Sequence, residues 1–60
     1  MKSLEDISRE FLKNHKVYRW HLKKVSEIPD KDIVRVCHWY VEDNHLHDEW
    51  NDFRDKEEQQ

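Results

Sequence analysis

The chain has 60 residues, with eleven Lys and Arg against fourteen Asp and Glu, and it contains no Gly, Ala or Thr. A chain of this length forms one domain at most, buries only about 60% of the surface that its unfolded state exposes, and is marginally stable. The absence of glycine excludes P-loops and dinucleotide fingerprints, which depend on that residue. Ala and Gly have GC-rich codons, so their absence also fits an AT-rich gene, such as the small reading frames of phages and mobile elements.

The single cysteine and the distribution of apolar residues indicate a cellular location. Cys37 has no partner for a disulfide within the chain, which fits a reducing, intracellular compartment. The sequence has no run of about 20 apolar residues, and its N-terminus lacks the apolar block of a secretion signal. We therefore expect a soluble, cytoplasmic protein with no membrane partner.

Charge is unevenly distributed along the chain. Residues 1–25 contain seven Lys or Arg and three Asp or Glu, whereas residues 26–60 contain four and eleven. This asymmetry predicts either that the two halves pair with each other or that two surfaces bind different partners.

The first predicted element is a helix over residues 4–25. Ser3 can cap its N-terminus, and acidic residues in the first turn favour the same start. Side chains suited to a core then recur every three or four residues over about six turns. They are Leu4, Ile7, Phe11, His15, Tyr18, Leu22 and Val25. Pro29 stops the pattern, so residues 26–29 should connect this helix to the next.

A second helix is predicted over residues 30–43, with Asp30 as its N-cap. Seven of the nine residues 33–41 are apolar, so this helix should lie in the middle of the fold. Trp39 falls outside its main apolar arc. Asn44 is expected to end the helix in a left-handed conformation or to cap a third helix.

A third helix is predicted over residues 45–57, and residues 54–60 form an acidic tail that should fray. Together the elements predict an all-α fold, a small three-helix bundle that forms a single domain over residues 1–60. The acidic third helix should lie near the basic first one. The expected core is Leu4, Ile7, Phe11, Tyr18, Leu22, Val25, Ile33, Val36, Cys37, Tyr40, Val41, Leu46, Trp50 and Phe53.

An α-β-β-α fold with a two-stranded hairpin is the alternative. Within residues 16–24, aromatic and apolar side chains alternate with polar ones, and residues 33–41 are rich in β-branched and aromatic types. We prefer three helices because the 3.6-residue pattern covers more positions. A strand at 33–41 would also be apolar on both faces of a sheet too thin to bury both.

Candidate partner-binding residues fall into an apolar and a basic group. They are Val17, Trp20, Val34, Trp39, Lys16, Arg19 and Lys23. The four apolar side chains lie off the main core stripes and exceed what a small soluble protein normally exposes. The cations belong to a basic face of the first helix, which could bind an acidic protein, or nucleic acid with Trp20 stacked on a base. The alternative is a solvated helix face and a core that Trp39 completes.

Weak candidates for metal ligands are Cys37, His38, His45 and His47. Thiolate and imidazole suit zinc, but adjacent residues on a helix point about 100° apart and cannot easily share one ion. The same divergence argues against a thiol–imidazole pair at Cys37 and His38, and residues 45–49 offer acids and bases without a recognisable arrangement. We therefore expect no metal, no cofactor and no enzymatic activity, with Cys37 buried as a small apolar side chain.

His15 lies on the apolar stripe of the first helix. We expect a histidine at the edge of the core with one ring nitrogen hydrogen-bonded. The alternative is a pH-sensitive element, since burial penalises the charged ring.

These observations predict a small non-enzymatic module that binds a larger protein as an inhibitor, adaptor or regulator. One alternative is a nucleic-acid-binding accessory protein that uses the basic face of the first helix. A second is a homodimer with an architectural role. No motif in the sequence encodes the identity of the partner.

Overall fold

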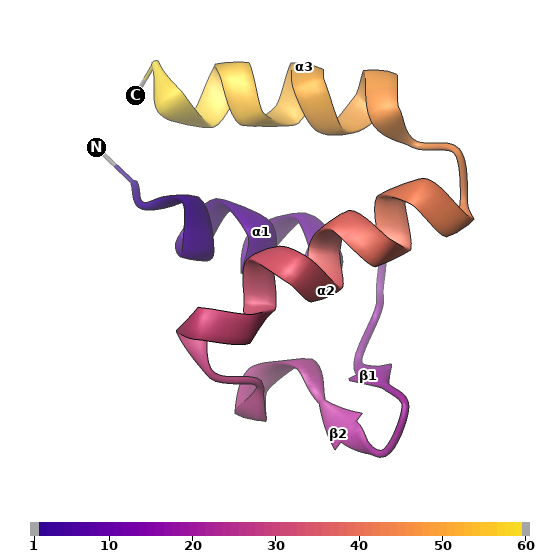
Figure 1. The fold of residues 1–60 in the computed structure, drawn as a ribbon. Helices are drawn as coiled ribbons and strands as arrows, with labels where there is room; N and C mark the ends of the chain where they lie inside the picture. Colours follow the sequence, from indigo (N-terminus) through magenta and orange to yellow (C-terminus); the bar gives the residue numbers. More distant parts are fainter. Residues whose placement is uncertain (1, 60) are drawn as a thin grey trace.

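The computed structural model describes residues 2–59, which form three α-helices and one short hairpin (Figure 1). In chain order the elements are α1 (Leu4–Asn14), β1 (Arg19–Trp20), β2 (Lys23–Lys24), the 3-10 helix η1 (Val25–Glu27), α2 (Asp30–Asp43) and α3 (His47–Glu58). Helix α2 crosses α1, and α3 packs on the side of this pair that is remote from the hairpin. Lys2 Nζ contacts Glu57 Oε2 at 2.7 Å and thereby links the start of α1 to the last turn of α3.

The three-helix architecture is confirmed, but the first helix is much shorter than predicted. A continuous helix over residues 4–25 is wrong, because α1 ends at Asn14 and a hairpin follows. The alternative fold correctly placed a hairpin strand within residues 16–24, whereas residues 33–41 belong to α2. The predicted bounds of α2 are confirmed, and α3 includes residues 54–58; fraying of this tail stays a prediction.

The beginning of α1 follows from its sequence. Ser3 Oγ accepts a hydrogen bond from the Asp6 backbone N–H at 3.2 Å, so Ser3 is the predicted N-cap. Two acidic residues in the first turn complement the positive end of the helix dipole. The helix that begins at this cap buries Ile7 and Phe11 against α2.

Helix α1 ends in a Schellman motif that is built without glycine. The Lys16 N–H donates to the Lys13 carbonyl at 2.9 Å, and the Val17 N–H donates to the Leu12 carbonyl at 2.9 Å. Lys16 carries the left-handed conformation, with φ of 58°. Half-buried Val17 packs against the core, which accounts for the position of the stop.

Helix α2 ends in the same motif. The His45 N–H donates to the Glu42 carbonyl at 3.3 Å, and the Leu46 N–H donates to the Val41 carbonyl at 2.9 Å. The left-handed residue is His45, with φ of 54°, and not Asn44 as predicted. Asn44, with φ of −109°, is the C-cap.

Replacing either left-handed residue by glycine should stabilise the protein. A left-handed conformation costs a non-glycine residue about 1–2 kcal/mol, and the larger unfolded-state entropy of glycine offsets part of that gain. We expect Lys16→Gly and His45→Gly each to raise the free energy of unfolding by roughly 0.5–1 kcal/mol, measured by urea denaturation. Lys13→Gly, within α1, should instead lower it by about 1 kcal/mol. Equal losses in Lys16→Gly and Lys13→Gly would contradict the motif.

The hairpin has a two-residue turn. Its register pairs Trp20 with Lys23, which leaves His21 and Leu22 at the tip. His21 has φ of 57°, a conformation that short hairpin turns usually assign to glycine. With no glycine in the chain, histidine occupies this position.

Arg9 fixes the segment after the hairpin to α1. Its guanidinium donates to the carbonyls of Val25 and Ile28 at 2.6 and 2.8 Å and contacts Asp30 Oδ1 at 3.0 Å. Asp30 is therefore an ion-pair partner; the N-cap position that the sequence assigned to it belongs to Pro29, without a side-chain cap bond. These contacts leave the Arg9 guanidinium engaged within the fold.

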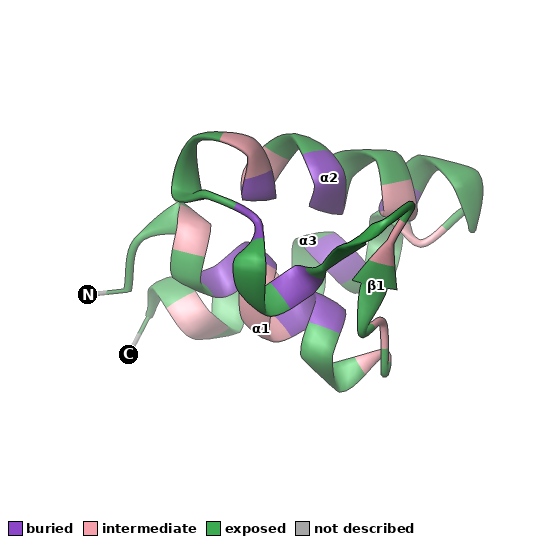
Figure 2. Ribbon diagram, turned by 90° about the horizontal axis from the view of Figure 1, so that it is seen from below, coloured by how far each residue is buried: buried purple, intermediate pink, exposed green. Residues whose placement is uncertain are grey.

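The core lies where α1, α2 and η1 meet, and α3 closes it (Figure 2). Its buried apolar residues are Ile7, Phe11, Leu12, Val25, Ile28, Ile33, Val36, Cys37, Val41 and Trp50. Phe11 is central, with ring centroids of His15, Trp50 and Phe53 at 4.3, 5.1 and 5.4 Å.

The shortened first helix explains the errors in the predicted core. Tyr18 and Leu22 are exposed because the helical stripe that placed them inside does not exist beyond Asn14. Leu4, in the first turn of α1, is exposed as well. Leu12 and Ile28 are buried although the sequence analysis did not include them. Three further predicted core residues are half-buried at its edge: Tyr40, Leu46 and Phe53.

Ser8 is a buried polar residue where α1 meets α2. Its side chain is fully buried, and its hydroxyl has no hydrogen-bond partner among the described residues. An unsatisfied buried hydroxyl costs about 1–3 kcal/mol, and alanine is the better helix former. Ser8→Ala should therefore raise the free energy of unfolding by roughly 1 kcal/mol in urea denaturation. A loss of similar size would show that the hydroxyl makes a stabilising contact.

Across residues 2–59, every helix is too short or too polar to cross a membrane.

Candidate functional site

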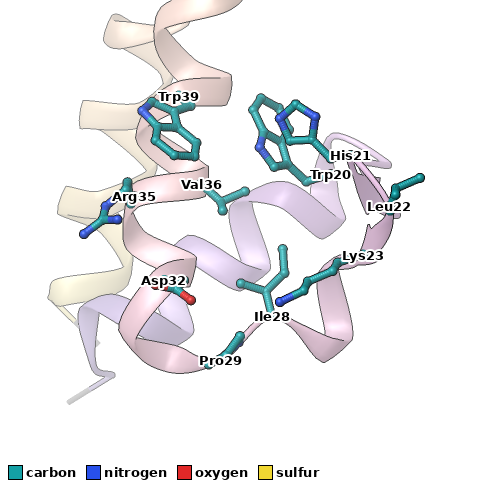
Figure 3. Close-up of a pocket in the computed structure, with 10 residues that line it drawn as sticks. All are labelled: Trp20, His21, Leu22, Lys23, Ile28, Pro29, Asp32, Arg35, Val36 and Trp39. Atoms are coloured by element: carbon teal, nitrogen blue, oxygen red, sulfur yellow. The ribbon is translucent and has the colours of Figure 1, made fainter.

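A groove of about 420 Å³ lies between the hairpin and α2 (Figure 3). We call it the Trp groove; its lining is Trp20, His21, Leu22, Lys23, Ile28, Pro29, Asp32, Arg35, Val36 and Trp39. The α2 residues Asp32, Val36 and Trp39 share one helix face because they are spaced by four and three positions. Buried Ile28 and Val36 make the groove apolar at its base.

Two tryptophans form one end of the Trp groove. The rings of Trp20 and Trp39 are nearly parallel, with 23° between their planes and 6.4 Å between centroids. Trp39 is 46% exposed, whereas Trp20 is half-buried. The Trp20 indole N–H is buried without an acceptor among residues 2–59, which costs stability at this position. The structure thus brings together two aromatic side chains that the sequence singled out separately.

The hairpin tip adds a second exposed apolar side chain. Leu22 is 95% exposed and points away from the Trp groove into solvent (Figure 3). A Leu at the tip of a two-residue turn has no neighbours to cover it. It is therefore a separate exposed apolar side chain, next to the Trp groove on the hairpin side of the molecule.

The charged side chains that line the Trp groove are two cations and one carboxylate. Lys23 and Arg35 line it and form no ion pair among the described residues, and the single carboxylate is that of half-buried Asp32. Figure 3 shows the Lys23 side chain extending across the groove towards Ile28. The site therefore combines aromatic and aliphatic surface with unpaired positive charge.

A second, smaller groove of about 300 Å³ lies beside the hairpin and α1. We call it the basic groove; its lining is Arg9, Lys13, Val17, Tyr18, Arg19, Lys24, Val25 and Ser26. Lys13, Arg19 and Lys24 form no ion pair within residues 2–59, and Tyr18 is 70% exposed.

The candidate partner-binding residues are therefore divided between different places. Trp20, Lys23 and Trp39 meet in the Trp groove, whereas Val17 and Arg19 line the basic groove. Lys16, at the end of α1, and Val34, half-buried against the core, line neither of these two grooves. Their predicted role in binding stays a prediction.

Sequence reasoning missed several residues of the Trp groove, above all Leu22, Ile28 and Arg35. The predicted helix over residues 4–25 placed Leu22 in the core and left no hairpin to pack beside α2. The alternation of Tyr18, Trp20 and Leu22 was the available signal, since it indicates a strand in this segment, but it does not show where that strand packs.

The weak metal candidates do not come together. Cys37 is fully buried, whereas His38 is exposed beside Trp50, with 6.0 Å between ring centroids. His45 occupies the left-handed turn after α2, and His47 begins α3. Over residues 2–59, no three His, Cys, Asp or Glu side chains form a group that could hold a metal ion.

Burial keeps the Cys37 thiol protonated. Desolvation raises the pKa of Cys37 from 9.0 to about 12, and the nearby Ser8 hydroxyl, which forms no hydrogen bond of ordinary geometry, opposes this only weakly. A thiol needs its thiolate form to act as a nucleophile. The arrangement fits the predicted role of Cys37 as a small buried apolar side chain.

We expect Cys37 to resist thiol reagents in the folded protein. Modification by Ellman's reagent should be slower by roughly a hundred-fold or more than in guanidinium, because thiolate and access are both lost. The raised pKa gives stability that is full below pH 9 and falls between pH 9 and 12. Wild type should thus lose roughly 1 kcal/mol more than Cys37→Ala between pH 8 and 10 in urea denaturation. Equal losses of stability in wild type and Cys37→Ala, together with rapid modification of the folded protein, would contradict the burial of Cys37.

His15 connects α1 to α3. Its Nδ1 lies 3.0 Å from the Phe11 carbonyl oxygen, and its Nε2 lies 3.0 Å from Glu49 Oε2. Because both partners are acceptors, both nitrogens donate only in the protonated ring. The expected position at the core edge is confirmed, but both nitrogens are engaged where one was predicted. A pH-sensitive role stays a prediction.

No protein-family model, curated protein sequence or solved structure matches this chain.

Proposed function

We propose that this chain is a small non-enzymatic module that binds a larger protein through the Trp groove and the adjoining hairpin tip. The observation that carries the proposal is the exposed apolar surface of Trp39 and Leu22 beside an apolar groove. A small protein that exposes such a surface without a partner risks aggregation, and large exposed patches usually mark interaction sites. Binding would place the module on a partner as an inhibitor, adaptor or regulator.

The choice of side chains supports binding to protein. Tryptophan is frequent among the residues that dominate interface energies, because it buries a large area while few rotatable bonds are fixed. Trp39 presents such a ring on the rigid scaffold of α2, and Trp20 supports it from the hairpin. The single buried cysteine fits the reducing cytoplasm as the proposed location.

Affinity capture tests this proposal. Tagged wild-type protein would be incubated with nuclease-treated cell lysate beside Trp39→Ala and Leu4→Ala, both of which remove a partly exposed apolar side chain (46% and 38% exposed). We expect one dominant protein with wild type and Leu4→Ala and its loss with Trp39→Ala. Recovery that is equal for all three chains would contradict the proposal.

A nucleic-acid-binding role is the second candidate. It is favoured by the basic groove, where unpaired cations lie around exposed Tyr18. In proteins that bind single strands, cations contact the phosphates and aromatic rings stack on the bases. The basic face of one helix that suggested this role does not exist, so the hairpin would have to carry it. Binding to phosphates weakens steeply with salt, whereas an apolar groove responds little, and a titration from 50 to 500 mM salt separates the two.

A further inference from the structure

Charge is segregated between the two ends of the molecule. The segment 16–24 contains four Lys or Arg and no acidic residue, whereas α3 contains six Asp or Glu and two Lys or Arg. Figures 1 and 2 place the hairpin and α3 on opposite sides of the α1–α2 pair. The ion pairs of α3 with other elements involve Lys2 and His15, so none within residues 2–59 reaches the hairpin.

This segregation leaves the hairpin cations without internal partners. Arg19, Lys23 and Lys24 are exposed and form no ion pair with any described residue. Lys23 also extends over the apolar base of the Trp groove, next to Ile28 (Figure 3). A side chain that enters the groove would therefore lie beside an unpaired ammonium group.

We infer that the partner presents an acidic segment, with an aromatic or leucine side chain for the Trp groove and carboxylates on either side for Lys23 and the neighbouring cations. This inference rests on the proposed function and specifies the chemistry of the partner. The apolar contact supplies affinity, and the opposite charges supply orientation and a faster encounter. Half-buried Asp32 lines the same groove, so the carboxylates should lie towards the hairpin.

A second copy of this chain fits the groove less well. Its acidic element, α3, has no large exposed apolar side chain; Trp50 is buried and Phe53 is half-buried. Docking α3 of one copy on the hairpin of another would satisfy charge and leave the apolar groove facing polar residues. A nucleic acid fits less well too, since Leu22, Ile28 and Val36 offer nothing to phosphates and Asp32 repels them.

Selection from a random library of 12-residue peptides displayed on phage tests the inference directly. The immobilised wild-type chain of residues 1–60 would be the target, and Trp39→Ala would serve for counter-selection. We expect enriched peptides to be acidic and to contain an aromatic residue or leucine. Enriched peptides that are apolar but neutral or basic would overturn the acidic partner and leave the proposed function standing. No enrichment over Trp39→Ala would contradict both.

Charge reversal in the protein makes the test quantitative. We expect Lys23→Glu to weaken the best peptide at least ten-fold by calorimetry, while Lys56→Glu on α3, the same change far from the groove, leaves its affinity within two-fold. Circular dichroism would check that both variants remain folded. Equal affinities for the two variants would overturn the inference. So would tighter binding of a twelve-nucleotide oligothymidine than of any peptide, or a concentration-dependent dimer that Trp39→Ala abolishes in sedimentation.

Discussion

Trp39→Ala should weaken binding of the recovered partner by about thirty-fold or more, the loss of at least 2 kcal/mol that is typical of a central interface tryptophan. Its indole is 46% exposed in the free protein and stacks on Trp20, so a partner that covers it removes the rest of the ring from water. The same substitution should change thermal stability little, because the ring lies outside the core. Biolayer interferometry would give the affinity and circular dichroism the melting temperature.

Leu4→Ala is the matched control for this prediction. Leu4 is 38% exposed, lies in the first turn of α1 and does not line the Trp groove. Its affinity should equal that of wild type. If Leu4→Ala and Trp39→Ala weaken binding equally, the loss reflects general destabilisation and the groove is not the interface.

Phe11→Ala should unfold most of the protein. Replacing a buried phenylalanine by alanine costs about 3–5 kcal/mol, and a domain of this size rarely has more than about 3–5 kcal/mol in total. Phe11 is 1% exposed and contacts both Trp50 and Phe53, through which α3 is held on the other helices. Far-ultraviolet circular dichroism at 25 °C should therefore show lost helicity, with no cooperative melting transition.

Phe53→Ala removes the same ring from the edge of this cluster. Phe53 is half-buried, so its loss should lower the free energy of unfolding by roughly 1–2 kcal/mol, less than a fully buried ring. That variant should stay folded and melt at a lower temperature. A folded Phe11→Ala that is no less stable than Phe53→Ala would show that the core is not centred on Phe11.

The parts of the fold that the sequence predicted correctly are those with redundant local signals. Helix α2 has an apolar face that only a helix can bury, and Pro29 determines where it begins. The start of α1 has Ser3 as its cap and acidic residues in its first turn. In α3, Trp50 is buried, as its place in the expected core predicted.

The second half of the first predicted helix failed for a physical reason. Tyr18 and Leu22 happen to continue the 3.6-residue spacing of Phe11, although the backbone turns away at Lys16. The left-handed position of a Schellman motif is usually occupied by glycine. This chain has no glycine, and Lys16 takes the position, so the sequence did not indicate the end of the helix. The apolar residue after it, Val17, was the remaining signal.

The candidate site was predictable by residue type but not by geometry. The excess of apolar side chains singled out Trp20 and Trp39 as surface residues. Their contact depends on the hairpin folding back along α2, which no local pattern of the two tryptophans contains. Because residues 19–24 form a hairpin, Arg19 and Lys23 line different grooves. The predicted first helix had placed both on one face.

Site-specific photocrosslinking tests the proposed interface most directly. A benzophenone amino acid would replace Leu22 at the exposed hairpin tip in one variant and exposed Asp55 on α3 in another, and cells expressing each would be irradiated. The interface proposed here predicts one strong crosslinked product from position 22, lost on adding Trp39→Ala, and none from position 55. A product from position 55 alone would place the partner on α3 and contradict the assignment of the Trp groove.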